Sequence, residues 1–202
     1  FLILKGFQDT VINKVYSFSA HLQVTKYSLD NSFEETPLSL NTDLYAKTEL
    51  FPYLDHVLEY SHKAGLVKTN DEVLGVVLKG VSNRFDLKRF ESNMIEGRFI
   101  DFSQTSYAKE VVVSKIIANK LDINLNEDII VHFFQDPPRL RKLKVVGIYE
   151  TNLAEYYDDK FMIGDIRMIQ RLNNWPDSLA GGVEVFVKDV DQIQVVEDAL
   201  NQ

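Results

Sequence analysis

The chain has 202 residues, of which 45% are hydrophobic and 26% are charged, an ordinary composition for a globular protein with one domain or two small lobes. Because the chain contains no cysteine, disulfides and thiolate metal sites are excluded. Its formal net charge of −8 argues against general nucleic-acid binding, which requires clustered Lys and Arg side chains that face the phosphates.

The first segment is apolar and then amphipathic. Residues 1–4 are Phe-Leu-Ile-Leu without a preceding methionine or basic region; they read either as the last turn of a longer apolar helix or as a buried first strand. In residues 6–16, Phe7, Val11, Ile12 and Val15 recur at helical spacing, which predicts a short amphipathic helix. No stretch reaches the roughly 20 apolar residues that cross a bilayer.

The next elements are read from alternation and turn residues. Residues 22–25 alternate apolar and polar side chains, the pattern of a half-buried strand. Residues 27–41 are rich in polar residues and contain Pro37, which predicts an exposed loop. Thr42 or Asp43 can then cap a helix of about two turns that ends near Pro52.

A β-hairpin and a short helix follow. Residues 56–67 and 73–81 flank the polar turn at 69–71, a pattern that predicts two antiparallel strands. Residues 87–94 are predicted to form a short helix. Residues 111–113 then form a buried strand, after which Ser114 can cap a helix with Ile116, Ile117 and Leu121 on its apolar side.

The C-terminal third continues the alternation of strands and helices. Strands are predicted at residues 129–134, 143–149, 161–163 and 183–187. Asp165 can cap a helix that turns Ile166, Ile169 and Leu172 inward. Asp191 and Gln194 have the spacing of a capping box, before a helical stripe of Ile193, Val196 and Leu200. The chain is therefore predicted to be an α+β protein without an internal repeat.

No catalytic, cofactor-binding or metal-binding residue is predicted. The sequence contains no P-loop, no GxSxG elbow, no HExxH motif and no dinucleotide-binding glycine pattern. Its four histidines, His21, His56, His62 and His132, are scattered, and structural or surface roles are favoured for them. Tyr156 to Asp159 is the most enzyme-like cluster, but adjacent carboxylates usually point apart, so a solvated loop or a partner contact is favoured there. Gly181 and Gly182 are read as a turn before a strand.

The segment 135–142 is the candidate partner-binding site. It is predicted to be a loop between two strands, in which Pro137 and Pro138 restrict the backbone while Arg139, Leu140 and Arg141 are presented outward. The alternative is a plain connector whose prolines prevent edge pairing.

Several segments together resemble the extracytoplasmic domain of lipoprotein-releasing (LolC/LolE-type) ABC transporter permeases, in the MacB/FtsX-like superfamily. They are ILKGFQDTVINKVYSFSAHLQV near the start, then VLGVVLKGV, EGRF, EVVVSKIIANKL, LKVVGIYET and VEVFVKDVDQIQVVEDAL. The resemblance covers nearly the whole chain. It implies a bilobed periplasmic domain, with a porter-like α/β lobe from residues 1–81 and 152–202 and an inserted, β-rich, sabre-like lobe from residues 82–151.

The resemblance also implies a function. In such transporters a cytoplasmic ATPase subunit hydrolyses ATP, and the permease, paired with a second permease subunit, transmits the motion across the inner membrane. This domain would then be a non-enzymatic part of a membrane protein, on the periplasmic face, contacting a lipoprotein substrate or a periplasmic lipoprotein carrier and no nucleic acid. In the LolC-like member a β-hairpin insertion grips the carrier. The equivalent connection here, residues 135–142, is short, which leaves carrier binding open.

Alternatives remain. A MacB-like efflux role or an FtsX-like signalling role fits the same resemblance. Two further readings are a hydrolase using the region from Tyr156 to Asp159 and a free-standing periplasmic binding module. The hydrolase is disfavoured because no nucleophile and base stand together in a recognisable motif.

Overall fold

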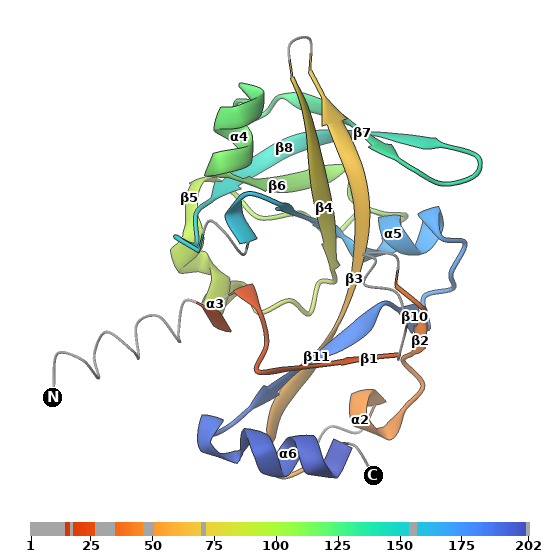
Figure 1. The fold of residues 1–202 in the computed structure, drawn as a ribbon, viewed down its shortest axis with the longest axis vertical. Helices are drawn as coiled ribbons and strands as arrows, with labels where there is room; N and C mark the ends of the chain where they lie inside the picture. The colour runs from red at the N-terminus through yellow and green to blue at the C-terminus, as the bar shows by residue number, and fades with distance from the viewer. Residues whose placement is uncertain are drawn as a thin grey trace, which may run out of the picture.

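The computed structural model describes residues 15–16, 18–26, 35–46, 51–69, 72–153 and 157–200. They form a mixed α+β fold with a nine-stranded sheet, a two-stranded sheet and a few short helices (Figure 1), which confirms the predicted class. Val15 and Tyr16 are helical. The rest of the predicted N-terminal helix and the apolar residues 1–4 lie outside the described residues.

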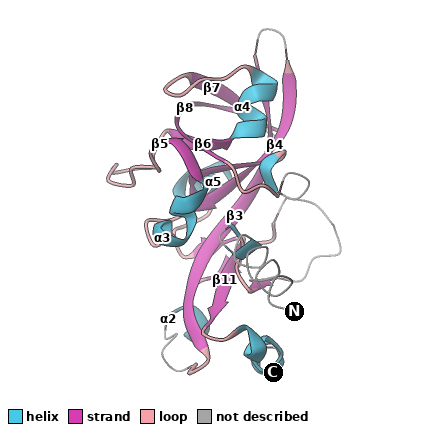
Figure 2. Ribbon diagram, turned by 90° about the vertical axis from the view of Figure 1, so that its left-hand side faces the viewer, coloured by secondary structure: helices cyan, strands magenta, loops and turns pink. Residues whose placement is uncertain are grey.

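One long strand, β3 (Leu54–Lys68), runs along the molecule (Figures 1 and 2). Its first half pairs with β11 (Gly182–Val187), and its second half pairs with β4 (Val73–Val81), both antiparallel. The β3–β4 pair confirms the predicted hairpin, and the backbone N–H of Thr69 donates to the carbonyl of Glu72 across its turn at 2.9 Å. Strand β3 therefore belongs to two packed regions.

Around the second half of β3, six strands close into a barrel. Strand β4 pairs with β9 (Phe161–Asp165), β9 with β6 (Glu110–Ser114), β6 with β8 (Arg139–Tyr149) and β8 with β7 (Asp128–Phe133); β7 then returns to β3. Closure removes the free edges that an open sheet would leave. The barrel core is apolar, and helices α4 (Lys115–Leu121) and α5 (Ile166–Leu172) add Ile117, Leu121 and Ile169 to it.

A smaller region surrounds the first half of β3. Strand β1 (Leu22–Thr25) pairs with β11, and β2 (Leu38–Ser39) pairs with β10 (Leu179–Ala180). Helices α2 (Asp43–Ala46) and α6 (Ile193–Leu200) lie at this end (Figure 1). Its core is also apolar and is formed mainly by aliphatic side chains of β3, β11 and α6, among them Val57, Val185 and Val196.

The barrel and the smaller region meet at Lys79, Glu184 and Phe18, which we call the crossing, and this crossing contains a buried ion pair. Lys79 on β4 and Glu184 on β11 are each 3% exposed, and Lys79 Nζ lies 2.7 Å from Glu184 Oε1. The same Nζ donates to the carbonyl of Phe18 at 2.8 Å and lies 4.9 Å from the Phe18 ring centroid. Helix α3 (Leu87–Phe90), a 3₁₀ turn (Glu91–Asn93) and β5 (Met94–Gly97) follow β4, and Phe90 and Tyr149 pack with Phe18.

Two of the predicted helix caps are confirmed and one is wrong. Ser114 Oγ accepts from the N–H of Ile117 at 3.0 Å, and Asp165 Oδ1 accepts from the N–H of Arg167 at 2.9 Å. At the last helix, however, a 3₁₀ turn begins at Val190, so Asp189 is the cap and accepts from the N–H of Asp191 at 3.0 Å. The predicted capping box fails because the helical turn starts earlier than the apolar stripe.

Two predicted boundaries also differ from the structure. The predicted loop over 27–41 contains strand β2 and the buried Leu40, because a partner strand, β10, pairs with it from far along the chain. The helix predicted over 87–94 ends as a 3₁₀ turn at Asn93, and Met94 starts β5, which pairs with β8. Helix α2 begins at Asp43 as predicted, while the second turn that the sequence predicts falls on residues 47–50, outside the described part.

The division into lobes stays a prediction. The residues of the inserted segment, 82–151, include β5, β6, α4, β7 and β8. Hydrogen bonding continues across the predicted boundaries, since β9 pairs with β4 on one side and with β6 on the other.

Candidate functional site

The β7–β8 hairpin projects from the barrel on the right of Figure 1. Its strands pair antiparallel, with Phe133 opposite Arg139 and Val131 opposite Arg141. Strand β6 pairs with β8 only from Lys144 onward. The tip of β8 is therefore held by β7 on one side and is not paired to β6 on the other.

The predicted loop over 135–142 is shorter in the structure. Arg139, Leu140 and Arg141 lie in strand β8, so only residues 134–138 connect the strands, and the Asp136–Pro137 bond is cis. The sequence interpretation was wrong here because two prolines next to four basic or apolar residues look like a loop. The backbone of Arg139 and Arg141 is instead paired with β7, a contact between strands that local sequence does not reveal.

The hairpin has one buried and one exposed face. Val131 and Phe133 are at most 1% exposed and belong to the barrel core. The opposite face carries apolar side chains that solvent reaches: Ile130 is 44% exposed, Leu140 is 55% exposed and Phe134 is 63% exposed. Strand alternation explains both faces. Large apolar side chains gathered on one projecting element are typical of an interaction surface.

Two arginines of the predicted site lack carboxylate partners within the described ranges. Arg139 Nη1 donates to the carbonyl of Arg171 at 3.4 Å, and Arg141 Nη1 donates to the carbonyl of Leu140 at 2.8 Å. Arg141 Nε is buried and has no hydrogen-bond partner among the described residues. Although the chain has a net charge of −8, no acidic side chain among the described residues neutralises these two arginines. They can therefore attract an anionic partner.

The hairpin tip is fastened to the end of helix α5. Gln135 Nε2 donates to the carbonyl of Leu172 at 3.0 Å, and Arg139 donates to the neighbouring carbonyl of Arg171. Carbonyls at a helix C-terminus have no partner inside the helix, so they readily accept such bonds. These contacts, which sequence reasoning missed because they join residues more than 30 positions apart, hold the tip in one orientation.

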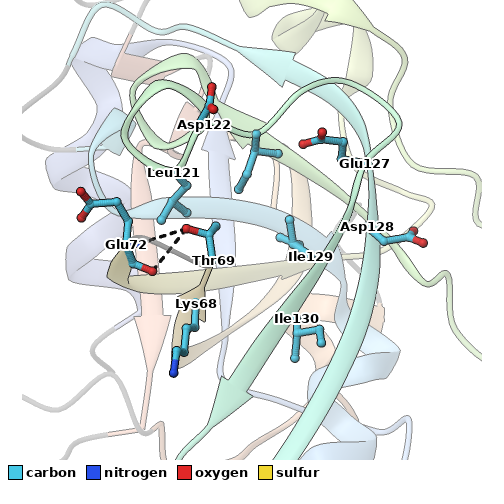
Figure 3. A pocket seen from close by; sticks show the side chains of 10 residues that line it. Lys68, Thr69, Glu72, Leu121, Asp122, Glu127, Asp128, Ile129 and Ile130 are labelled. Carbon is cyan, nitrogen blue, oxygen red and sulfur yellow. Dashed lines mark hydrogen bonds between the residues drawn. The ribbon is translucent and has the colours of Figure 1, made fainter.

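A concave site lies at the base of the same hairpin. A cavity of about 470 Å³ opens between the β3–β4 turn and the connection from α4 to β7 (Figure 3). Its wall combines apolar side chains with carboxylates and one lysine: Lys68, Thr69, Glu72, Leu121, Asp122, Ile123, Glu127, Asp128, Ile129 and Ile130. Ile130 belongs both to this wall and to the exposed hairpin face, so the two surfaces are continuous.

The sequence also singled out Asp158, Asp159 and Gly181. Asp158 is 1% exposed, and its carboxylate accepts from the backbone N–H groups of Thr151 and Asn152 and from the Thr151 hydroxyl. It therefore holds a turn. Asp159 lies beside it with one buried carboxylate oxygen, Oδ1, that has no partner in the described residues, and Tyr156 is outside them. Gly181 connects β10 to β11 as predicted, whereas Gly182 is not in the turn but is the first residue of β11, paired with Tyr60.

The histidines are dispersed. His56 stacks on Phe186 at 4.3 Å between ring centroids, His62 Nδ1 lies 2.9 Å from Glu35 Oε1, and His21 accepts from a backbone N–H. His132 is on the exposed hairpin face, opposite Leu140. Across the described ranges, no three His, Asp or Glu side chains come together in a way that could hold a metal ion, and none of the described helices is long and apolar enough to span a membrane.

Comparison with known proteins places the fold. A family model described as the MacB-like periplasmic core domain matches residues 1–202. The extracellular domain of the noncanonical ABC-type transporter YknZ from Gram-positive bacteria is similar in structure, with a TM-score of 0.55, 16% identity and coverage of 79% of this chain and 78% of that one. The periplasmic region of MacB from Actinobacillus actinomycetemcomitans is similar with a TM-score of 0.57, 15% identity and coverage of 88% and 78%. No curated protein sequence matches. The chain therefore belongs to the MacB-like periplasmic core domain family, whose members are extracytoplasmic domains of ABC transporter permeases.

Proposed function

We propose that this domain serves a permease of the lipoprotein-releasing type and that its β7–β8 hairpin docks a periplasmic partner. The observation that carries the proposal is the exposed face of Ile130, Phe134 and Leu140 on a projecting hairpin. A hairpin that faces water on one side needs no such side chains for its own core.

The two arginines of the hairpin indicate which charge the partner would carry. Arg139 and Arg141 lie on the same side of β8, since they are two residues apart in a strand. They pair with Phe133 and Val131, so this side is the opposite one from Leu140. Within the described residues neither forms an ion pair, and Arg141 Nε has no hydrogen-bond partner. A partner that reaches both sides of the hairpin tip, with an apolar patch against one side and carboxylates against the other, would complement both features. A soluble lipoprotein carrier or the lipoprotein itself would be that partner.

In this proposal the hairpin belongs to an inserted lobe of residues 82–151, and residues 1–81 and 152–202 form the lobe nearer the membrane. The domain itself performs no chemistry. A cytoplasmic ATPase drives the membrane part, a second permease subunit completes the transporter, and the domain transmits the movement to the bound partner. Pro137 and Pro138 restrict the backbone at the tip, which lowers the entropy lost on docking.

A MacB-like efflux role or an FtsX-like signalling role is the second candidate. It is favoured by the short connection of residues 134–138, which leaves little chain for a gripping insertion. In that case the same hairpin face would contact an adaptor or a cell-wall enzyme instead of a lipoprotein carrier.

Binding of the isolated domain to candidate periplasmic carriers tests the proposal. We expect Phe134→Ser and Leu140→Ser to weaken binding about tenfold or more each, as truncated apolar anchors do, and Arg139→Glu with Arg141→Glu to weaken it further. Val73→Ser, at an exposed apolar position on β4, and Lys88→Glu, on α3, are the matched controls. Unchanged affinity for every carrier in the hairpin variants would refute docking at this surface, and affinity for an adaptor alone would favour the second candidate.

A further inference from the structure

A second cluster of titratable side chains surrounds Phe186 on β11, away from the hairpin. Phe186 is 5% exposed. His56 stacks on its ring, the ring of His21 meets it edge-on with centroids 5.9 Å apart, and the Arg89 guanidinium lies 4.6 Å from its centroid. Three groups that carry, or can acquire, a positive charge therefore share one buried ring.

The hydrogen bond of His21 defines its protonation state. His21 Nδ1 lies 3.1 Å from the backbone nitrogen of Val187. A backbone N–H can only donate, so Nδ1 must be unprotonated and the ring neutral, with its proton on Nε2. In an imidazolium both ring nitrogens carry protons. Protonation of His21 would consequently place two donors against each other and break this bond.

The surroundings of His21 disfavour the charged form. Among the described residues, the titratable and charged groups around it are Tyr16, Asp55 and His56 from β3, and Arg89 from α3, with Asp86 beside Arg89. Burial lowers the pKa of His21, Arg89 lowers that pKa further, and Asp55 acts in the opposite direction.

Asp55 already has other partners. Its Oδ2 lies 2.9 Å from His56 Nδ1 and 4.0 Å from Arg89 Nη2. These two side chains therefore compete with His21 for the Asp55 carboxylate.

The position of His21 gives its protonation a structural consequence. The ring lies 4.1 Å, centroid to centroid, from Tyr16, one of the helical residues before β1. His21 directly precedes β1, a four-residue strand that, among the described residues, pairs with β11 alone. The His21–Val187 bond thus ties the incoming segment to β11 at the point where pairing begins.

We propose that His21 is a proton-operated switch, in which protonation of Nδ1 breaks the bond to the Val187 N–H and releases β1 and Tyr16 from β11. The direction follows from linkage. Because the pKa of His21 is lower in the folded state, the stabilisation is complete above the ordinary histidine pKa of about 6.5 and is lost as the pH falls below it.

Hydrogen exchange on the whole chain tests the switch. Protection of the amides in β1 and β11 is compared at pH 7.5 and pH 5.5 after correction for intrinsic exchange rates. In the wild-type chain we expect protection to fall by at most about tenfold, because pH 5.5 lies about one unit below the ordinary histidine pKa. Amides of β6 and β8 in the barrel should change little.

Variants separate His21 from the other histidines. His21→Asn keeps an acceptor near the Nδ1 position but does not titrate, so its β1 and β11 protection should be the same at both pH values. His132→Asn on the hairpin and His56→Asn should keep a pH-dependent loss. The switch is overturned if the wild-type chain loses no protection, if His21→Asn loses as much as the wild type, or if His56→Asn alone abolishes the loss. Should His21→Asn fold poorly, the NMR titration of His21 in the wild-type chain decides: a pKa at or above about 6.5 overturns the proposal.

Discussion

The barrel and the crossing beside it are stabilised by different kinds of contact. The barrel core is built mainly from apolar side chains, whose packing is non-directional and can be rebuilt by other residues of similar volume. At the crossing, Lys79, Glu184 and the Phe18 carbonyl form a buried charged network, which is favourable in one geometry only. The barrel therefore provides a platform for its hairpin, while the crossing sets how the segment with Phe18, β4 and β11 are joined.

The largest effect should come from the barrel side of the hairpin. Phe133→Ala removes a side chain that is 1% exposed and should lower the free energy of unfolding by about 3–5 kcal/mol, measured by urea denaturation. Its neighbour provides the control: Phe134 is 63% exposed, and Phe134→Ala should change that free energy by less than about 0.5 kcal/mol. Equal losses in the two variants would contradict the two-faced hairpin.

A somewhat smaller loss is expected at the crossing. Lys79→Met leaves Glu184 buried without its cation and should cost about 3 kcal/mol, the lower end of the usual range because Gln23 Nε2 still lies 3.4 Å from the same oxygen. Replacing both partners, Lys79→Met with Glu184→Leu, should recover most of this loss. A double variant as unstable as the single one would show that the pair is needed for more than mutual neutralisation.

The smallest effect is expected from an ion pair on the barrel surface. Arg98 Nη2 lies 2.5 Å from Glu110 Oε1, but the Arg98 side chain is 55% exposed, so Arg98→Met should cost only about 0.2–1 kcal/mol at pH 7. The hydrogen bonds from Arg98 lower the pKa of Glu110 from its ordinary 4.5. The stabilisation is therefore present above pH 4.5 and is lost as the pH falls below it, so the wild type and the variant should converge in acid denaturation. A difference that persists in acid would point to lost packing by the Arg98 stem.

The β7–β8 hairpin shows which parts of the candidate site can be predicted from local sequence and which cannot. Residues 129–134 and 143–149 are recognisable as strands from their apolar side chains, and Pro137 and Pro138 mark the turn between them. The extension of β8 to Arg139 is not recognisable, because Arg-Leu-Arg-Lys has no buried partner until β7 lies beside it. The bond from Gln135 to the end of α5 spans 37 positions, so no local pattern could indicate it.

The burial of Glu184 is another feature that local sequence patterns do not predict. Glu184 alternates with valines in the sequence and reads as a solvent-facing position, yet it is 2% exposed as a residue. Strand β11 is covered on both faces in the assembled fold, and Lys79, 105 positions away, supplies the cation that makes burial of the carboxylate tolerable.

The amino-acid sequence by itself determined the α+β class, the β3–β4 hairpin, the Ser114 and Asp165 caps and most strand positions, since each depends on side chains within a few residues of one another. Only the tertiary structure decided the closure of the barrel through β7 and β3, the buried pair at the crossing, the bond from His21 to Val187 and the two faces of the β7–β8 tip. These features join residues that are distant in the chain, and they form because packing and desolvation act on whichever groups the fold brings together.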